Sequence, residues 1–149
     1  MTGKRLLLRW GVAAALGISP ALADALAAAG LQQRTVWDAV YTDAQAKRGA
    51  AVYDASCASC HGADLAGADV APPLSGFEFG SNWDGQTLDA LVERIRRSMP
   101  QGAPGSLTRQ ESVDVVAFML SKGGLPAGPS ELGVQADALA RINYRALKP

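Results

Sequence analysis

The chain has 149 residues, of which 48% are hydrophobic and 19% are charged, and its formal net charge at pH 7 is zero. This length and composition fit one globular domain with a modest core and leave no room for a second domain. The first 23 residues carry three basic and no acidic side chains, so the remainder has 11 basic against 14 acidic side chains. A mildly acidic body without a pronounced basic patch argues against nucleic acid or an anionic membrane as a partner.

Residues 1–23 have the features of a Sec-type export signal. A basic region ending at Arg9 precedes an apolar stretch, and Ala21-Leu22-Ala23 is a small-x-small cleavage site. The apolar stretch is shorter than the roughly 20 residues that span a bilayer, so we expect cleavage rather than a lasting membrane anchor. Cleavage before Asp24 would give a periplasmic protein without stable membrane insertion, and the alanine-rich stretch 25–29 offers a second cleavage site.

Residues 24–41 are expected to form an N-terminal extension, followed by a helix that runs from Thr42 to the cysteine motif. Thr42 and Gln45 have the spacing of a capping box. The residues that recur on one face of this helix are Ala46, Gly49, Ala50 and Tyr53. A glycine inside a helix costs about 0.5–1 kcal/mol relative to alanine, so Gly49 indicates either a close helix crossing or a tolerated surface position.

Both cysteines and the single histidine of the chain lie in one pentapeptide, Cys57-Ala58-Ser59-Cys60-His61. This C-x-x-C-H arrangement is typical of covalent haem attachment, in which the thiols form thioethers with the porphyrin and the imidazole binds the iron. A thioredoxin-type pair would follow a strand, a disulfide would close only a short loop, and a zinc site would need further ligands. The motif therefore favours one haem c, attached through Cys57 and Cys60, with His61 as an iron ligand.

The second nitrogen of the His61 ring needs a hydrogen-bond acceptor, which fixes the ring and strengthens it as a ligand. The segment Ala71-Pro72-Pro73-Leu74 supplies backbone carbonyls at a rigid bend, and the carbonyl of Pro72 is the favoured acceptor. A role of the two prolines as plain loop stiffeners stays open.

The sixth iron ligand follows by elimination. A second histidine is absent, so the candidates after the initiator are Met99 and Met119. Met119 lies in an apolar helical run, where methionine usually fills the core. Met99 ends a helix and precedes Pro100, which favours extended geometry, and a Gly/Pro-rich loop follows. Met99 is therefore the expected ligand, and a His/Met pair suits electron transfer.

Two further helices are expected downstream, and no strand of useful length. The first runs from about Thr87 to Ser98, with an outer Glu93–Arg97 pair. The second runs from Thr108 or Arg109 to Lys122 and stops at Gly123-Gly124. Their inward residues are expected to be Leu88, Leu91, Val92, Ile95, Val113, Val116, Ala117 and Leu120.

Residues 123–149 read as a stiff linker followed by a C-terminal helix. The residues at helical spacing in it are Leu132, Ala136, Leu139, Ala140 and Tyr144. This segment either packs back on the preceding domain, which is the commoner fate of an apolar face, or docks a partner.

Over about residues 35–122 the chain resembles the class I cytochrome c family, and more narrowly the small cytochromes found with bacterial quinoprotein dehydrogenases. The resemblance rests on the C-x-x-C-H motif, the Pro72 to Leu74 turn, Trp83, Met99-Pro100 and the last helix. It implies an all-α cytochrome c fold over residues 42–122, with three or more helices around one covalently bound haem. It also implies a glycine and aromatic helix crossing, matched by Gly49, Tyr53 and Phe118.

The resemblance further implies that Pro72, Leu74 and Trp83 bind the cofactor together with the cysteines and the iron ligands. Trp83 would lie near a haem propionate, although a plain core position is an equal alternative.

The expected function is periplasmic transfer of single electrons, as a carrier and not an enzyme. Its partners would be redox proteins such as a quinoprotein dehydrogenase, a membrane complex or a terminal oxidase. One alternative is an electron-transfer subunit of a quinoprotein dehydrogenase or oxidase complex. A second is a gas sensor or enzyme with five-coordinate haem iron.

Overall fold

The structure is a computed structural model that describes residues 33–68 and 71–149, and residues 33–149 form one compact unit. The expected export signal at 1–23 lies outside the described residues, as does the first half of the expected extension at 24–41. No helix in the described ranges has the length and apolar character needed to cross a membrane.

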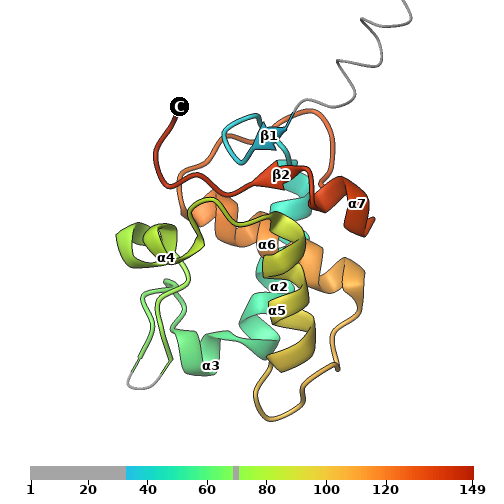
Figure 1. Ribbon diagram of the computed structural model, residues 1–149. Helices are drawn as coiled ribbons and strands as arrows, with labels where there is room; N and C mark the ends of the chain where they lie inside the picture. The colour runs from blue at the N-terminus through green and yellow to red at the C-terminus, as the bar shows by residue number, and fades with distance from the viewer. Residues whose placement is uncertain (1–32, 69–70) are drawn as a thin grey trace, which may run out of the picture. The chain divides into compact units, whose positions relative to one another are not determined.

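The described chain is mostly helical, which confirms the all-α fold class (Figure 1). In chain order its elements are β1 (Arg34–Thr35), α2 (Asp43–Ser56), α3 (Ala58–His61), α4 (Gly76–Trp83), α5 (Leu88–Ser98), α6 (Arg109–Lys122), α7 (Ala136–Leu139) and β2 (Ile142–Asn143). The sheet that these residues contain is a parallel pair of two-residue strands, in which Arg34 lies opposite Ile142. No pattern in the sequence indicates this sheet, because strands this short show no alternation.

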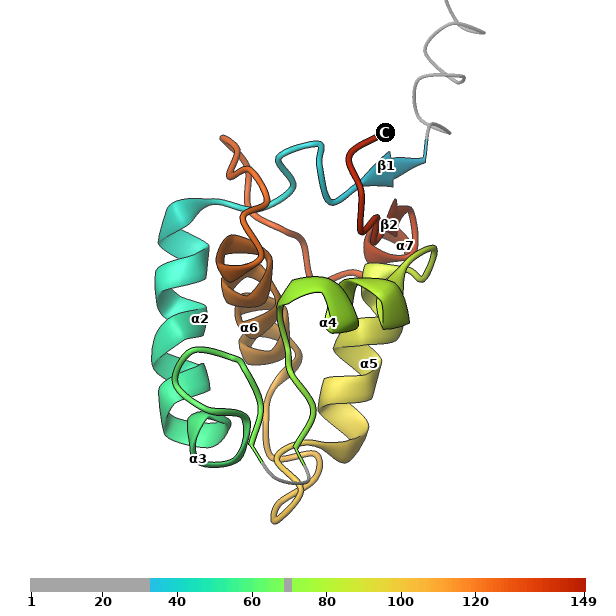
Figure 2. The same cartoon turned by 90° about the vertical axis from the view of Figure 1, so that its left-hand side faces the viewer.

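Helices α2 and α6 cross closely, and Figure 2 shows them side by side. A Cβ atom on Gly49 would lie 1.8 Å from the backbone oxygen of Asp114, so only glycine allows this approach. The rings of Tyr53 and Phe118 lie 5.2 Å apart at the same crossing. The glycine and aromatic crossing expected from the resemblance is therefore present.

Helices α5 and α6 confirm the sequence analysis closely. Thr87 caps α5 by accepting a hydrogen bond from the Ala90 amide at 3.2 Å, and Thr108 forms a full capping box with Glu111 at the start of α6. All eight side chains expected to point inward are buried. The outer Glu93–Arg97 ion pair is also present, at 3.0 Å.

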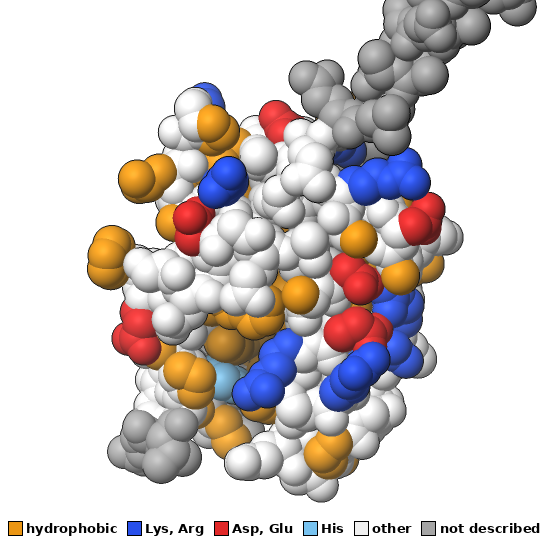
Figure 3. All heavy atoms as spheres, in the orientation of Figure 1, with side chains coloured by type: hydrophobic (Ala, Val, Ile, Leu, Met, Phe, Trp, Pro, Cys, Tyr) orange, Lys and Arg blue, Asp and Glu red, His pale blue; other side chains and the backbone are white. Residues whose placement is uncertain are grey.

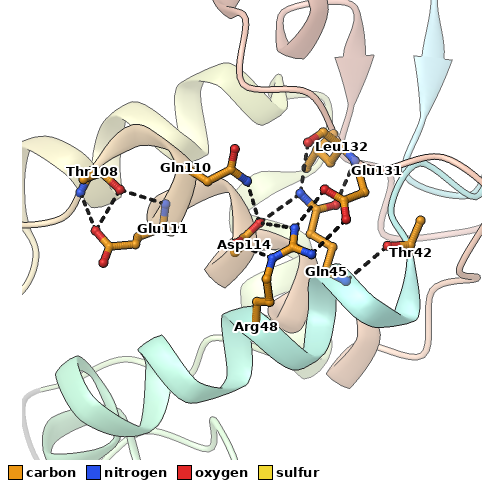
Figure 4. A network of polar contacts seen from close by, with 9 residues as sticks. All are labelled: Thr42, Gln45, Arg48, Thr108, Gln110, Glu111, Asp114, Glu131 and Leu132. Carbon is orange, nitrogen blue, oxygen red and sulfur yellow. Dashed lines mark hydrogen bonds and ion pairs between the residues drawn. The ribbon is translucent and has the colours of Figure 1, made fainter.

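The capping box expected at the start of α2 is only half formed. Thr42 accepts a hydrogen bond from the Gln45 amide at 3.1 Å, but the Gln45 side chain does not return to Thr42. Its amide group donates to the Leu132 carbonyl and to Asp114, and it accepts from the Leu132 amide (Figure 4). Because Gln45 is fully buried, its polar atoms need these partners, which come from a distant part of the chain.

The C-terminal segment packs on the same core as the helices before it. Its buried side chains are Leu125, Leu132, Leu139, Ile142 and Tyr144. The expected linker is also packed, since a Cβ on Gly128 would lie 2.1 Å from the Ala39 oxygen. The expected C-terminal helix is shorter than predicted, because α7 covers only four residues before the chain extends to pair with β1.

Candidate haem-binding site

The C-x-x-C-H motif follows α2 directly and forms the one-turn helix α3. The Cys57 amide still donates to the Tyr53 carbonyl of α2, and the His61 amide donates to the Cys57 carbonyl at 3.0 Å. Gly62 ends the turn with a φ of 76°, a conformation that favours glycine. The turn thus brings the two thiols and the imidazole onto one short segment.

Both cysteines are free, so the motif holds no disulfide in this structure. Cys57 is half-buried against the core, whereas Cys60 is exposed. Burial raises the pKa of the Cys57 thiol, and the neighbouring Cys60 raises it further. The motif is preceded by a helix and not by a strand, and the described residues hold no cluster of three or more metal-binding side chains. Neither a thioredoxin-type site nor a zinc site fits these observations.

His61 is buried, with 7% of its surface exposed, and its Nδ1 atom lies 2.9 Å from the Pro72 carbonyl oxygen. A carbonyl oxygen can only accept a hydrogen bond, so Nδ1 carries the proton and donates it. The lone pair of the ring then lies on Nε2, the nitrogen that remains free to bind a metal ion. The hydrogen bond to Pro72 is the one that the sequence analysis favoured.

The described residues 62–68 and 71–74 hold Pro72 in place. Leu65 is fully buried, and its carbonyl accepts a hydrogen bond from the Leu74 amide at 2.9 Å. Gly67 bonds back to the His61 carbonyl, and a Cβ there would lie 2.5 Å from the Ala71 oxygen. The tight packing of this loop fixes the carbonyl that orients the His61 ring.

Tyr53 ties α2 to the same loop. Its hydroxyl donates to the Gly62 carbonyl at 2.7 Å. Burial raises the pKa of Tyr53 to about 12, with smaller contributions from Cys57 and Asp64. The phenol therefore remains a hydrogen-bond donor throughout the neutral range.

Met99 is the residue directly after α5, and its backbone is extended, with φ −129° and ψ 150°. This conformation agrees with the constraint from the following proline. The side chain is half-buried and packs against the core. Met119 is buried at 3% exposure inside α6, as expected for a core methionine.

Helix α4 was not anticipated from the sequence, and it carries Trp83 at its end. Two glycines within eight residues hide its helical character, although Phe79 and Trp83 have the i, i+4 spacing that could have indicated it. The ring centroids of Phe79 and Trp83 lie 6.1 Å apart, and Phe79 meets Tyr144 edge-on at 5.6 Å. Trp83 and Leu74 are both half-buried against the core.

A hollow in the surface exposes part of the histidine ring (Figure 3). The side chains around this hollow are mainly hydrophobic, and a basic side chain borders it on one side. A buried imidazole with one free nitrogen, two free thiols on the same turn and an apolar surround fit a covalently attached haem. The residues present therefore match the cofactor that the motif implies.

Comparison with known proteins also indicates a cytochrome c. A family profile described as "Cytochrome C oxidase, cbb3-type, subunit III" matches residues 44–119, about half of the chain. Thiosulfate dehydrogenase of Allochromatium vinosum is 40% identical over 82 residues, which cover 49% of this chain and 30% of that protein. Cytochrome c-551 of Bacillus subtilis is 33% identical over 81 residues, which cover 54% of this chain and 66% of that protein. The chain thus spans less than two thirds of the length of both relatives.

Among solved structures, the sulfane dehydrogenase SoxCD from Paracoccus pantotrophus superposes with a TM-score of 0.49 at 22% identity, covering 72% of this chain and 61% of that chain. The profile match runs from the first turn of α2 to the last turns of α6 and includes the C-x-x-C-H motif. The chain therefore belongs to the cytochrome c family that this profile describes, whose members bind haem c covalently.

Proposed function

We propose that this protein transfers single electrons on one haem c, which Cys57 and Cys60 would hold covalently and whose iron His61 and Met99 would bind. The observation that supports this most strongly is the hydrogen bond from His61 Nδ1 to the Pro72 carbonyl, which leaves Nε2 for the iron. The relative named cytochrome c-551 supports the role of a carrier rather than an enzyme.

A bound haem iron supplies the one-electron chemistry, by cycling between the ferrous and ferric states. Pro72 holds the His61 ring in a fixed orientation and increases its basicity as a ligand. The Met99 thioether would bind the iron, favour its ferrous state and leave no coordination position open to oxygen or peroxide. Leu74 and Trp83 are proposed to line the haem, with the Trp83 indole near a propionate.

The test is a spectroelectrochemical titration of protein produced together with a haem-ligation pathway. We expect a reversible one-electron transition between oxidised and reduced spectra, with one haem per chain in a pyridine haemochrome assay. The double variant Cys57→Ala/Cys60→Ala is the control and should retain no covalent haem. A parent protein without haem, or one that reacts rapidly with carbon monoxide, would overturn the assignment in favour of no cofactor or of a five-coordinate sensor.

We further propose that residues 1–23 direct export and that the mature protein works in the periplasm. Its partners there would be redox proteins, namely a dehydrogenase or membrane complex as electron donor and an oxidase as acceptor. Cleavage is tested by N-terminal sequencing of the exported protein, which should begin at or shortly after Asp24.

A second candidate function is that of an electron-transfer subunit in a dehydrogenase complex. The 40% identity to thiosulfate dehydrogenase, which this chain matches over only 30% of its length, favours this candidate. Gel filtration of the native protein from its own cells distinguishes a free carrier from a complex subunit. A free carrier elutes at the size of one chain, whereas a subunit elutes with a larger assembly.

A further inference from the structure

The loop that carries Met99 has little structure of its own. This Met99 loop, residues 99–108, joins α5 to α6, and residues 101–106 are all exposed. Within it the Ala103 amide bonds to the Pro100 carbonyl and the Ser106 amide bonds to the Ala103 carbonyl. No hydrogen bond joins residues 100–106 to any other described part of the chain. The position of the loop therefore depends on how its two ends are held.

Arg109, the first residue of α6, anchors the C-terminal end of the Met99 loop to α5 through its guanidinium group. Its Nη1 donates to Glu93 and its Nη2 to Asp89, each at 2.5 Å, and both carboxylates lie on α5. Its Nε donates to the Val134 carbonyl of the C-terminal segment at 2.5 Å. We call these four residues the Arg109 clamp.

The clamp is partly withdrawn from water. The side chains of Arg109, Asp89 and Glu93 are 25%, 26% and 23% exposed. Ion pairs shielded to this degree are less screened by salt than fully exposed pairs, and hydrogen bonds between charged groups are stronger than those between neutral groups. Without Arg109, Asp89 would lose its ion pair, whereas Glu93 would keep those with Arg96 and Arg97 on its own helix.

We propose that Arg109 is a positioning residue that keeps the Met99 thioether on the haem iron by anchoring the C-terminal end of the Met99 loop to α5. The clamp also connects the C-terminal segment to the Met99 loop, because the Val134 carbonyl accepts one of the three hydrogen bonds from Arg109. This inference rests on the proposed His61/Met99 ligation. It assigns the control of that ligation to residues that touch neither the haem nor the iron.

The test compares Arg109→Gln with Arg48→Gln. Arg48 is a matched control, because it also bridges two carboxylates, Asp114 and Glu131, neither of which lies on α5 or in the Met99 loop (Figure 4). Both changes remove one arginine and two ion pairs. Only the change at Arg109 releases the Met99 loop.

The measurement is the rate at which carbon monoxide binds to the reduced, haem-loaded protein. Carbon monoxide reacts only with molecules in which Met99 has left the iron, so a tenfold rise in that fraction gives about a tenfold faster reaction. We expect about this increase for Arg109→Gln, with a weaker absorption band from the bond between ferric iron and sulfur. Arg109→Lys should restore only part of the parent behaviour, since an ammonium group cannot engage both carboxylates in the same fork.

Equal rates for Arg109→Gln and the parent would overturn the proposal, and so would the same increase in Arg48→Gln. If Arg109→Gln does not accumulate, Asp89→Asn replaces it and should show a smaller increase than expected for Arg109→Gln. Hydrogen exchange of the Ala103 and Ser106 amides gives a second readout and should be faster in the clamp variants alone. A parent protein without methionine ligation would instead contradict the proposed function. The Met99→Ala variant gives the carbon monoxide rate expected when no methionine binds the iron.

Discussion

The Nδ1 atom of His61 lies 2.9 Å from the carbonyl oxygen of Pro72, and this single contact sets the tautomer of the ring. The acceptor is a backbone atom, so the side chain of Pro72 matters only through the bend that it imposes. Met99 is held differently, by the end of α5 and by the constraint of the following proline. The two proposed iron ligands thus depend on separate parts of the chain.

Replacing Met99 with alanine should open one coordination position of the haem iron. We expect rapid carbon monoxide binding by the reduced protein and a lower reduction potential, because the thioether favours ferrous iron. Met119→Leu is the control: Met119 is buried in the core, and a volume-conserving change there should leave both properties at the parent values. A Met99→Ala protein with the parent spectrum would mean that another atom binds the iron.

At the scale of elements, the crossing of α2 with α6 positions the haem motif, since α3 continues directly from the end of α2. The crossing depends on Gly49, whose Cα faces the backbone of Asp114. Around it, Arg48 bridges Asp114 and Glu131, while Gln45 bonds to Leu132. One face of α2 therefore binds both α6 and the C-terminal segment.

Gly49→Ala should destabilise the fold, although alanine is the better helix former. The added Cβ would overlap the Asp114 oxygen and push the helices apart, and overpacking of this kind costs about 1–3 kcal/mol or more. The control is Ala51→Gly at an exposed position of the same helix, which should cost only about 1 kcal/mol through helix propensity. Urea denaturation of both variants measures the difference, and a Gly49→Ala protein as stable as the parent would exclude the close crossing.

Acid should weaken the contacts that Glu93 makes on α5. Hydrogen bonds from Arg96, and then from Arg97 and Arg109, lower the pKa of Glu93 in the folded protein. A carboxylate with a lowered pKa stabilises the fold above its unfolded pKa of about 4.3, and this contribution is lost as the pH falls through the folded pKa. Thermal unfolding measured from pH 7 to pH 3 should show a smaller loss of stability in Glu93→Gln than in the parent. An identical pH dependence in the two proteins would contradict this account.

At the scale of the whole molecule, the described residues form one unit whose two ends meet. β1 pairs with β2, and the Trp37 indole donates to the Arg145 carbonyl at 2.9 Å. Tyr41 donates through its hydroxyl to the Leu125 carbonyl at 2.7 Å. The segment after α6 is therefore part of the core rather than an appended tail.

Leu139→Ala tests this directly, because Leu139 lies in α7 and is fully buried. Truncating a buried leucine costs about 2–5 kcal/mol, so the midpoint of unfolding should fall markedly. The matched control, Leu147→Ala, changes a side chain of the same segment that is 83% exposed and should be nearly neutral. Equal effects of the two substitutions would show that the C-terminal segment does not contribute to the core.

The sequence predicted those parts of the fold that local spacing determines. Apolar periodicity located α5 and α6, and the motif with its following proline pair indicated the His61–Pro72 contact. The remainder depends on partners far away in the chain. The Gln45 side chain bonds to Leu132, which lies 87 residues later in the chain. Strand β2 forms only because β1 lies beside it. No local pattern indicates such contacts. The same holds for Arg109, because its partners lie on another helix and in the C-terminal segment.

The proposed function requires that Cys57 and Cys60 hold one haem covalently, with the imidazole of His61 available to its iron. The most direct measurement is the intact mass of the exported protein, produced with a haem-ligation pathway and unfolded before analysis. We expect the mass of the processed polypeptide plus one haem, with no free thiol, and a loss of that increment in Cys57→Ala/Cys60→Ala. A parent protein with the mass of the bare polypeptide and two titratable thiols would contradict it.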